Sequence, residues 1–262
     1  MCGRYASSRK PEDLVEEFEV ERVEVLAPLE ADYNVAPTKD VYAVFDRVSR
    51  RDREGADGEV RATRRLKSVR WGLVPSWAKD RGIGSRMINA RVETLADKPA
   101  YRKAFAKRRC LLPADGYFEW YPTQQAGQSG KPLKQPFFIR PRDGGVLAMA
   151  GLYEIWRDKS VLDESADDAF LWTATVVTTS AEDAVGHIHD RMPMLVEPER
   201  YADWLDSTVS GTDELAALLV PAAPGRLEAY PVSREVNDVR NNGPQLVLPV
   251  DVEENQDRLF DV

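Results

Sequence analysis

Residues 109–120 have the sequence RCLLPADGYFEW, and this stretch shows how the fold is built. The apolar run at 109–114 predicts a short buried strand. Asp115-Gly116 is a dipeptide typical of tight turns, because glycine adopts backbone conformations that other residues avoid. The aromatic residues at 117–120 predict a second strand directly after the turn. The stretch therefore indicates short strands joined by tight connections.

Further strands and short helices are predicted on both sides of this stretch. Strands are expected over 41–48, 64–71, 137–140, 148–156, 172–178 and 191–196, with late fragments at 230–232 and 246–249. Short helices are expected over 11–19, from 94 through 105, and over 180–183, 199–205 and 213–219. Loops are expected at 33–38, 75–84 and 122–135, and charged, exposed segments at 49–60 and 157–169. This mixture indicates an α+β fold, a single domain with an antiparallel, barrel-like β core surrounded by short helices.

Composition limits the class of protein. The chain has 262 residues, 43% of them hydrophobic, and neither a repeat nor a linker divides it. We assign residues 1–250 to the domain and 251–262 to a C-terminal tail. No apolar run is long enough to span a membrane, and no secretory signal is expected, so we predict a cytoplasmic monomer. Two cysteines and two histidines favour neither a disulfide framework nor a metal site, and no cofactor is expected.

Positive charge is concentrated in one segment. The net charge is −8, yet residues 61–109 contain 15 Lys or Arg and only 3 Asp or Glu. Aromatic residues are interleaved with these cations, namely Trp71, Trp77, Tyr101 and Phe105. Cations mixed with aromatic rings are typical of surfaces that bind single-stranded nucleic acid. The alternative is a solvated basic face without a ligand.

The first residues, Met1-Cys2-Gly3, offer unusual chemistry. Aminopeptidases remove Met when the next side chain is small, which would give Cys2 a free α-amine beside its thiol. Such an aminothiol condenses with an aldehyde to a five-membered thiazolidine. The α-amine has a pKa of about 7.7–8.0, so part of it is nucleophilic at neutral pH. The alternative is that Cys2 belongs to a frayed, inert chain end.

Three further polar residues lie among apolar or turn residues, where a functional role is favoured. Glu119 is flanked by Phe118 and Trp120, so desolvation would raise its pKa toward the range of acid–base catalysis. His189 is suited to proton transfer near pH 7, and Asn89 to hydrogen bonding. The alternatives are a solvent-facing or Arg-paired Glu119, a core or cap His189, and a helix-capping Asn89. Cys110 is assigned no role.

Several segments together resemble the SOS-response-associated peptidase family of abasic-site processing proteins. The segments are MCGRYA at 1–6, YNVAPT at 33–38, RWGLVPSW at 70–77, NARVET at 89–94, RRCLLPADGYFEW at 108–120, AGLYE at 150–154, HDRMP at 189–193 and PVSREVN at 231–237. They span nearly the whole chain in the order typical of the family. The departures lie in loops near 49–60, 122–135 and 158–168 and in the tail.

The resemblance implies covalent capture of abasic sites in single-stranded DNA, including sites at junctions with duplex. Cys2 would form the thiazolidine with the abasic aldehyde. Asn89 would hold the sugar, Glu119 would shuttle protons, and His189 would assist ring opening. DNA contacts are implied for Arg4, Arg91 and Arg191 at phosphates, for Trp71 under a base, and for the Asn34–Pro37 loop at a junction. The protein would associate with the nucleoid when it is bound to DNA.

The resemblance also implies possible peptidase activity, beginning with removal of Met1, and weak abasic-site lyase activity. Two alternatives stay open. One is an N-terminal-nucleophile hydrolase of the glutamine amidotransferase type, which also begins Met-Cys-Gly and uses its thiol on glutamine. The other is a non-catalytic single-stranded DNA-binding protein in which Cys2 is incidental.

Overall fold

A computed structural model of the chain describes residues 2–48, 62–126, 130, 132–163, 169–181, 185–221 and 223–251. The strands are β1 (Tyr5–Ser7), β2 (Arg22–Glu24), β3 (Asp32–Val35), β4 (Asp40–Arg47), β5 (Thr63–Trp71), β6 (Asn89–Arg91), β7 (Arg109–Ala114), β8 (Gly116–Ala126), β9 (Pro132–Pro141), β10 (Leu147–Arg157), β11 (Phe170–Ser180), β12 (Arg191–Pro193) and β13 (Leu227–Pro231). They form two sheets.

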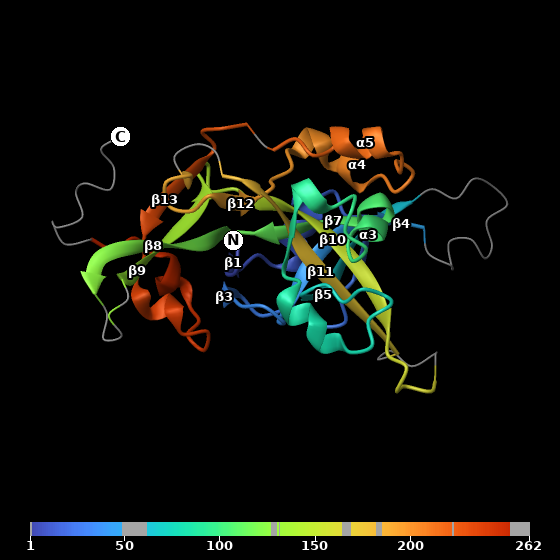
Figure 1. Cartoon of the computed structure of the whole chain (residues 1–262), viewed down its shortest axis with the longest axis horizontal. Coiled ribbons are helices and arrows are strands. Elements are labelled where there is room, and N and C mark those ends of the chain that lie inside the picture. Colours follow the sequence, from blue (N-terminus) through green and yellow to red (C-terminus); the bar gives the residue numbers. More distant parts are fainter. Residues whose placement is uncertain are drawn as a thin grey trace.

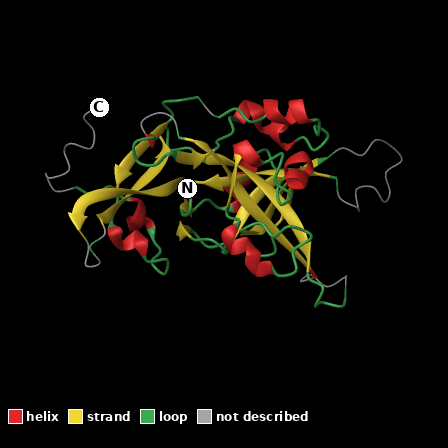
Figure 2. Ribbon diagram, in the orientation of Figure 1, coloured by secondary structure: helices red, strands yellow, loops and turns green. Residues whose placement is uncertain are grey.

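The helices are short and lie around the strands (Figure 2). The α-helices are α1 (Pro11–Glu17), α3 (Arg102–Lys107), α4 (Tyr201–Leu205) and α5 (Thr212–Ala217). The 3₁₀ helices are η1 (Arg81–Arg86), η2 (Val92–Thr94), η5 (Pro198–Arg200), η6 (Arg234–Asn237) and η7 (Pro244–Val247). Within the described residues, no helix combines the length and the apolar character that a membrane span requires.

The larger sheet closes into a barrel. Its strand order is β12-β11-β10-β7-β4-β5-β2, with β6 beside β11. An additional pairing of β11 with β5 joins the two ends of the run β11-β10-β7-β4-β5. That closing pair is parallel, whereas the other pairs in the ring are antiparallel. The predicted single α+β domain with a barrel-like core is thus confirmed. The sequence did not predict the parallel strand pair that closes the barrel.

The second sheet has the order β13-β9-β8-β1-β3 and is antiparallel throughout. β7 and β8 follow each other in sequence but belong to different sheets, so Asp115-Gly116 carries the chain from the barrel into this sheet (Figure 1). Only glycine fits at 116, because a Cβ there would lie 2.5 Å from Cζ of Phe138. The stretch 109–120 therefore connects the two sheets.

Some local predictions were wrong where pairing overrides local composition. The expected loop at 122–135 is largely strand, because the end of β8 pairs with the start of β9, with Pro122 opposite Lys134 and Ala126 opposite Pro132. The expected loop at 33–38 begins inside β3, and the expected strand at 246–249 overlaps η7. Ser180 is the last residue of β11, and half of the helix predicted over 180–183 lies outside the described residues. The charged segment at 49–60, most of the predicted tail and residues 182–184 lie outside the described residues.

The N-terminal strand, β1, lies in the core of the protein. β1 pairs with β8 on one side and β3 on the other, with Tyr5 opposite Tyr117 and Val35. Cys2, Tyr5, Trp71 and Tyr117 belong to one buried cluster and are at most 1% exposed. The start of the described chain consequently lies near the middle of the molecule, beside β8 (Figure 1).

Candidate active site at Cys2

Cys2 is a packed residue and not a frayed end. Its side chain is fully buried, and the β1–β8 pairing sets it beside Glu119 of β8. Burial raises the pKa of the Cys2 thiol, and the nearby Glu119 carboxylate raises it further. The thiol is therefore neutral at physiological pH and keeps its proton until a reaction removes it.

Asn89 contacts Cys2 directly. Its Nδ2 donates to the Cys2 carbonyl oxygen at 2.8 Å, and its backbone carbonyl accepts from the hydroxyl of Tyr101 at 3.2 Å. Asn89 lies in β6, which pairs with β11, so it is not a helix cap. Its Oδ1 is buried and accepts no hydrogen bond from any described residue. Because an unpaired buried acceptor is costly, this oxygen is suited to receive a donor from a ligand or from an amine at residue 2.

Glu119 is 4% exposed and lies in β8 opposite Phe137. Burial raises the pKa of Glu119 to about 7. At neutral pH the carboxyl group is therefore found in both protonation states, which suits a group that gives and takes protons. Glu119 is thus desolvated, as the sequence predicts, and the solvent-facing alternative does not hold.

His189 is partly exposed, and its ring is oriented by its neighbours. Nδ1 lies 2.9 Å from the backbone nitrogen of Arg191 and 3.0 Å from Oδ1 of Asp190. In the neutral ring Nδ1 accepts from the Arg191 amide, which leaves the proton on Nε2, whereas in the protonated ring Nδ1 donates to Asp190. Burial lowers the pKa of His189, so the neutral form with its Nε2 proton predominates at pH 7.

Glu119 and His189 open into a cleft of about 610 Å³. The lining residues are Arg4, Glu119, Trp120, Leu133, Lys134, His189, Arg234 and Asn237. The Arg4 guanidinium lies 5.8 Å from the Trp120 ring centroid, and the Trp120 indole donates to Oδ1 of Asn237 at 2.7 Å. A carboxyl group and an imidazole thus face a cleft whose walls carry an aromatic ring and several cations.

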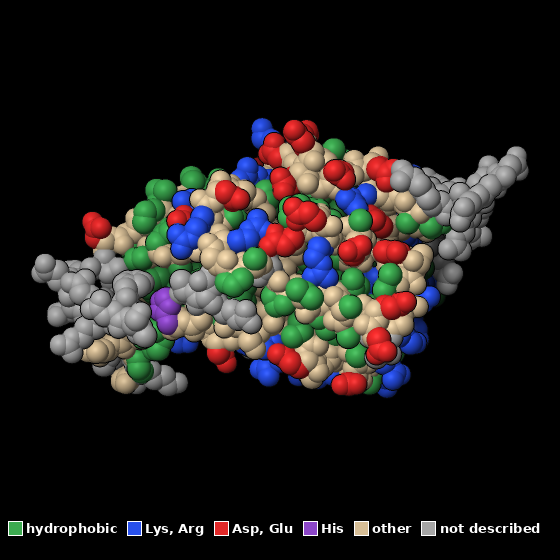
Figure 3. Space-filling model, turned by 90° about the horizontal axis from the view of Figure 1, so that it is seen from above, with side chains coloured by type: hydrophobic (Ala, Val, Ile, Leu, Met, Phe, Trp, Pro, Cys, Tyr) green, Lys and Arg blue, Asp and Glu red, His purple; other side chains and the backbone are tan. Residues whose placement is uncertain are grey.

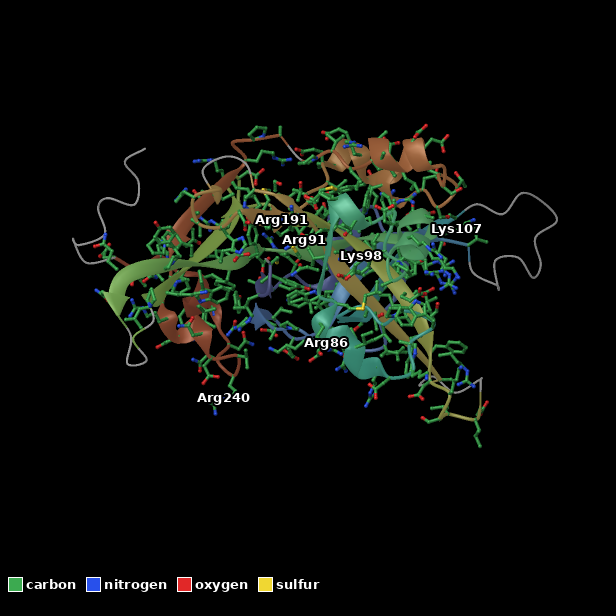
Figure 4. The ribbon with its side chains drawn as sticks, in the orientation of Figure 1. Arg86, Arg91, Lys98, Lys107, Arg191 and Arg240 are labelled. Atoms are coloured by element: carbon green, nitrogen blue, oxygen red, sulfur yellow. The ribbon has the colours of Figure 1, made fainter. Side chains whose placement is uncertain are left out.

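Arg91 and Arg191 lie on opposite sides of the end of β11. Arg91 is opposite Thr178 and Arg191 is opposite Ser180. Arg191 makes a two-pronged ion pair with Glu93, at 2.5 and 3.1 Å, and donates to the Thr178 carbonyl at 2.7 Å. Arg91 is exposed, and the two arginines are drawn close together near the middle of the molecule (Figure 4).

Comparison with known proteins identifies the family of this chain. The family model of the SOS response associated peptidase (SRAP) matches residues 1–239. The chain belongs to this family. A solved structure shares the fold of the chain. A crystal structure of a protein from Bacteroides thetaiotaomicron has a TM-score of 0.71 at 23% identity and covers 95% of this chain and 100% of that one.

Curated relatives of this SRAP chain match along most of its length. Abasic site processing protein YoqW of Bacillus subtilis is 35% identical and covers 94% of this chain and 99% of its own. Abasic site processing protein YedK of Escherichia coli is 34% identical, with coverage of 95% and 100%. Abasic site processing protein HMCES of Gallus gallus is 32% identical and covers 71% of this chain and 58% of its own.

Two DNA contacts implied by the SRAP resemblance are wrong for this structure. Trp71 is fully buried, its indole donates to the Ile88 carbonyl at 3.0 Å, and its ring packs on Tyr5, so no base can stack on it. Asn34 is also fully buried. Its Nδ2 donates to the carbonyl oxygens of residues 236, 238 and 241, and its Oδ1 accepts from Arg4 at 2.6 Å. Pro37 is half-buried, and its junction role stays a prediction.

Several cations of the basic segment already form ion pairs or hydrogen bonds within the SRAP fold. Arg65 pairs with Glu24 at 2.5 Å, Arg64 pairs with Asp46 at 3.0 Å, and Arg109 donates to several backbone carbonyls. On the face shown in Figure 3, basic and acidic side chains are mixed, and no continuous basic patch covers it. The net charge of residues 61–109 therefore overstates the surface available to a polyanion.

One exposed aromatic residue, Trp77, has no role implied by the family motifs, although it is one of the aromatic residues interleaved with the cations of the basic segment. Trp77 is 59% exposed and lies between β5 and η1, close in sequence to Lys79 and Arg81. The signal was available, because Trp77 follows Pro75-Ser76 in a predicted loop, whereas Trp71 ends a predicted strand. Loops present side chains to ligands more often than strand interiors do.

Proposed function

We propose that the protein binds single-stranded DNA carrying an abasic site and captures the abasic sugar covalently through Cys2. Relatives that span almost the whole chain are named abasic site processing proteins. The observation that supports the proposal most strongly is the position of Cys2. Its carbonyl accepts a hydrogen bond from Asn89, and its thiol pKa is raised by burial and by the nearby Glu119 carboxylate. An aldehyde-reactive aminothiol would thus lie beside a group able to move protons at neutral pH.

The chemistry requires neither an oxidant nor a reductant. Removal of Met1 gives Cys2 an α-amine, and the ring-opened abasic sugar offers an aldehyde at C1′. The amine adds to C1′, and the carbinolamine loses water to give an imine. The sulfur of Cys2 then bonds to the same carbon while the thiol proton moves to the nitrogen, which closes the thiazolidine.

Each of the other site residues has a role in this sequence. Glu119, with a pKa of about 7, would donate a proton when water leaves and accept one during ring opening and reversal. The unpaired Oδ1 of Asn89 would accept an N–H of the Cys2 amine and so orient it. Neutral His189 would donate its Nε2 proton to a sugar oxygen as the ring opens.

DNA binding is proposed to rest on cations around this site and on one exposed ring. Arg4, Arg91 and Arg191 would contact phosphates that flank the lesion, and Trp77 would take the stacking role that Trp71 cannot. Phosphate and stacking contacts carry little sequence information, so we expect little sequence specificity. A preference for junctions, a monomeric state and association with the nucleoid remain predictions.

The imine intermediate allows one side reaction. A β-elimination from this imine would cleave the strand on the 3′ side of the sugar, so we include weak abasic-site lyase activity in the proposal. Peptidase activity is proposed for removal of Met1 from the chain itself, in line with the family description.

The proposal is tested by mixing the protein with a single-stranded oligonucleotide that carries one abasic site. We expect a band that stays shifted on a denaturing gel after heating. Its intact mass should equal protein without Met1 plus oligonucleotide minus one water, because only the imine step releases a molecule. An undamaged oligonucleotide, and one whose aldehyde is blocked with an alkoxyamine, should give no shift.

Absence of the band with protein that has lost Met1 would exclude the thiazolidine mechanism. Hydrolysis of glutamine by the same preparation would then support the amidotransferase-type alternative. Equal, reversible binding to damaged and undamaged strands would support the non-catalytic DNA-binding alternative.

Trp77→Ala is expected to weaken binding of undamaged single-stranded DNA by about 5- to 150-fold, since stacking contributes about 1–3 kcal/mol per base. Fluorescence anisotropy with a labelled oligonucleotide measures the effect. The melting temperature should change little because Trp77 is 59% exposed. Leu26→Ala, at a side chain that is 97% exposed, is the matched control and should bind like wild type. Wild-type affinity in Trp77→Ala would show that the ring does not stack on bases.

A further inference from the structure

The cleft contains a second pair of cations that the proposed function does not use. Lys134 lies on β9 and Arg234 on η6, and both line the cleft together with Glu119 and His189. Neither of these two side chains forms an ion pair or a hydrogen bond with another described residue. Exposed arginines nearby behave differently, since Arg140 pairs with Glu228 at 2.8 Å and Arg240 pairs with Asp238 at 2.6 Å.

These cations belong to a different part of the fold from Arg91 and Arg191. Arg91 and Arg191 flank β11 of the barrel, whereas Lys134 lies in the second sheet, on the strand next to β8. Arg234 is attached to the same strand, because the amide of Val232 donates to the Pro136 carbonyl at 3.0 Å. Glu119 lies on β8, the strand next to that of Lys134, and His189 lies two residues before Arg191, so each set of cations adjoins one of the two groups that face the cleft.

The positive charge of Lys134 affects the pKa values of both Glu119 and His189. It lowers the pKa of Glu119 and that of His189, although burial is the larger influence on each. The side chain of Lys134 lines the same cleft as Glu119 and His189, where the abasic sugar would react. The side chains lining the cleft carry three Lys or Arg against one carboxyl group, so the cleft favours an anion.

We propose that Lys134 and Arg234 bind the phosphate on the side of the abasic residue opposite to the phosphates held by Arg91 and Arg191. This inference rests on the proposed function and adds a substrate class to it. The preferred substrate is an abasic residue inside a continuous strand, with a phosphate on each side. A strand that ends at the lesion leaves one set of cations empty.

The other lining residues of the cleft are compatible with a DNA strand. Arg4 and Trp120 also line the cleft, and each is held by a hydrogen bond, to Asn34 and Asn237 respectively. Phosphates are the charged groups of a DNA strand and the usual partners of Lys and Arg, and such contacts set register without reading sequence. Lys134 and Arg234 form no ion pair with a described carboxylate and line the cleft of the proposed reaction site, as expected of residues that bind a phosphate.

The test compares the double variant Lys134→Ala/Arg234→Ala with Arg140→Ala/Arg240→Ala. The control removes the same charge from neighbouring surface positions, and Arg240 projects away from Arg91 and Arg191 (Figure 4). Crosslinking rates at subsaturating DNA are measured with the abasic site internal, at the 5′ end or at the 3′ end, without terminal phosphates. We expect the Lys134/Arg234 variant to slow the internal substrate and one terminal substrate by about tenfold or more, and to leave the other unchanged.

A second measurement does not depend on crosslinking. The affinity for undamaged single-stranded DNA is measured across salt concentrations, and each lost phosphate contact lowers the log–log slope by about 0.7. The Lys134/Arg234 variant should lose about 1.4 from the slope, whereas the slope of the control should stay near that of wild type. An unchanged slope, or equal slowing of both terminal substrates, would overturn the inference. Failure of wild type to crosslink any substrate would instead overturn the proposed function, and the slope would still decide this inference.

Discussion

Replacing Cys2 with Ala is expected to abolish the heat-stable crosslink while leaving an imine that borohydride can trap. Aminopeptidases also remove Met before the small side chain of Ala, and intact mass verifies this, so the α-amine remains and still condenses with the aldehyde. Without the Cys2 sulfur the imine cannot close to a thiazolidine, and it hydrolyses when the sample is heated. Denaturing gels run with and without borohydride separate the two stages. We expect complete loss of the stable band and retention of the trapped one.

Cys110→Ala is the matched control, because Cys110 is the other buried free cysteine and lies in the same core cluster. It should crosslink like wild type once its folding is verified by thermal unfolding. A stable crosslink in the Cys2→Ala protein would assign the capture to another nucleophile. Loss of the borohydride-trapped species as well would mean that the amine of residue 2 does not attack the sugar.

Local sequence pattern predicted much of the fold, because several strands carry their own signal. The apolar run at 109–114 corresponds to β7, and the strands predicted over 64–71 and 148–156 lie within β5 and β10. The closing β11–β5 pair and the separation of β7 from β8 depend on contacts between distant segments, so no local pattern reports them. The polar end of β8 is a strand only because β9 supplies its partners.

Sequence motifs located the site residues but did not distinguish contact with a ligand from support of the fold. Asn34 and Trp71 lie in matched motifs, yet both are fully buried and bonded to backbone carbonyls. An asparagine that donates to several carbonyls and an asparagine that contacts a sugar look alike in a sequence. Glu119 could be identified because its aromatic neighbours predict desolvation, which is a local property.

The Glu119→Gln variant is expected to slow crosslink formation by about 10²- to 10⁴-fold, the usual contribution of a general acid–base group. Its effect on the pH profile is more specific than its effect on the rate. In the wild type, attack needs the free α-amine and so rises through a pKa of about 8, whereas loss of water needs protonated Glu119. Because burial raises the pKa of Glu119 to about 7, the protonated form declines above neutral pH.

These opposing requirements predict a bell-shaped profile for wild type, with its maximum between about pH 7 and pH 8. In Glu119→Gln the side chain no longer titrates, so the falling limb should disappear and the slower rate should rise to a plateau. Single-turnover rates from pH 5.5 to pH 9.5 test this, with Glu154→Gln as the control, because Glu154 is equally buried but paired with Arg108 away from the cleft. A bell of unchanged shape in Glu119→Gln would assign the falling limb to a group other than Glu119.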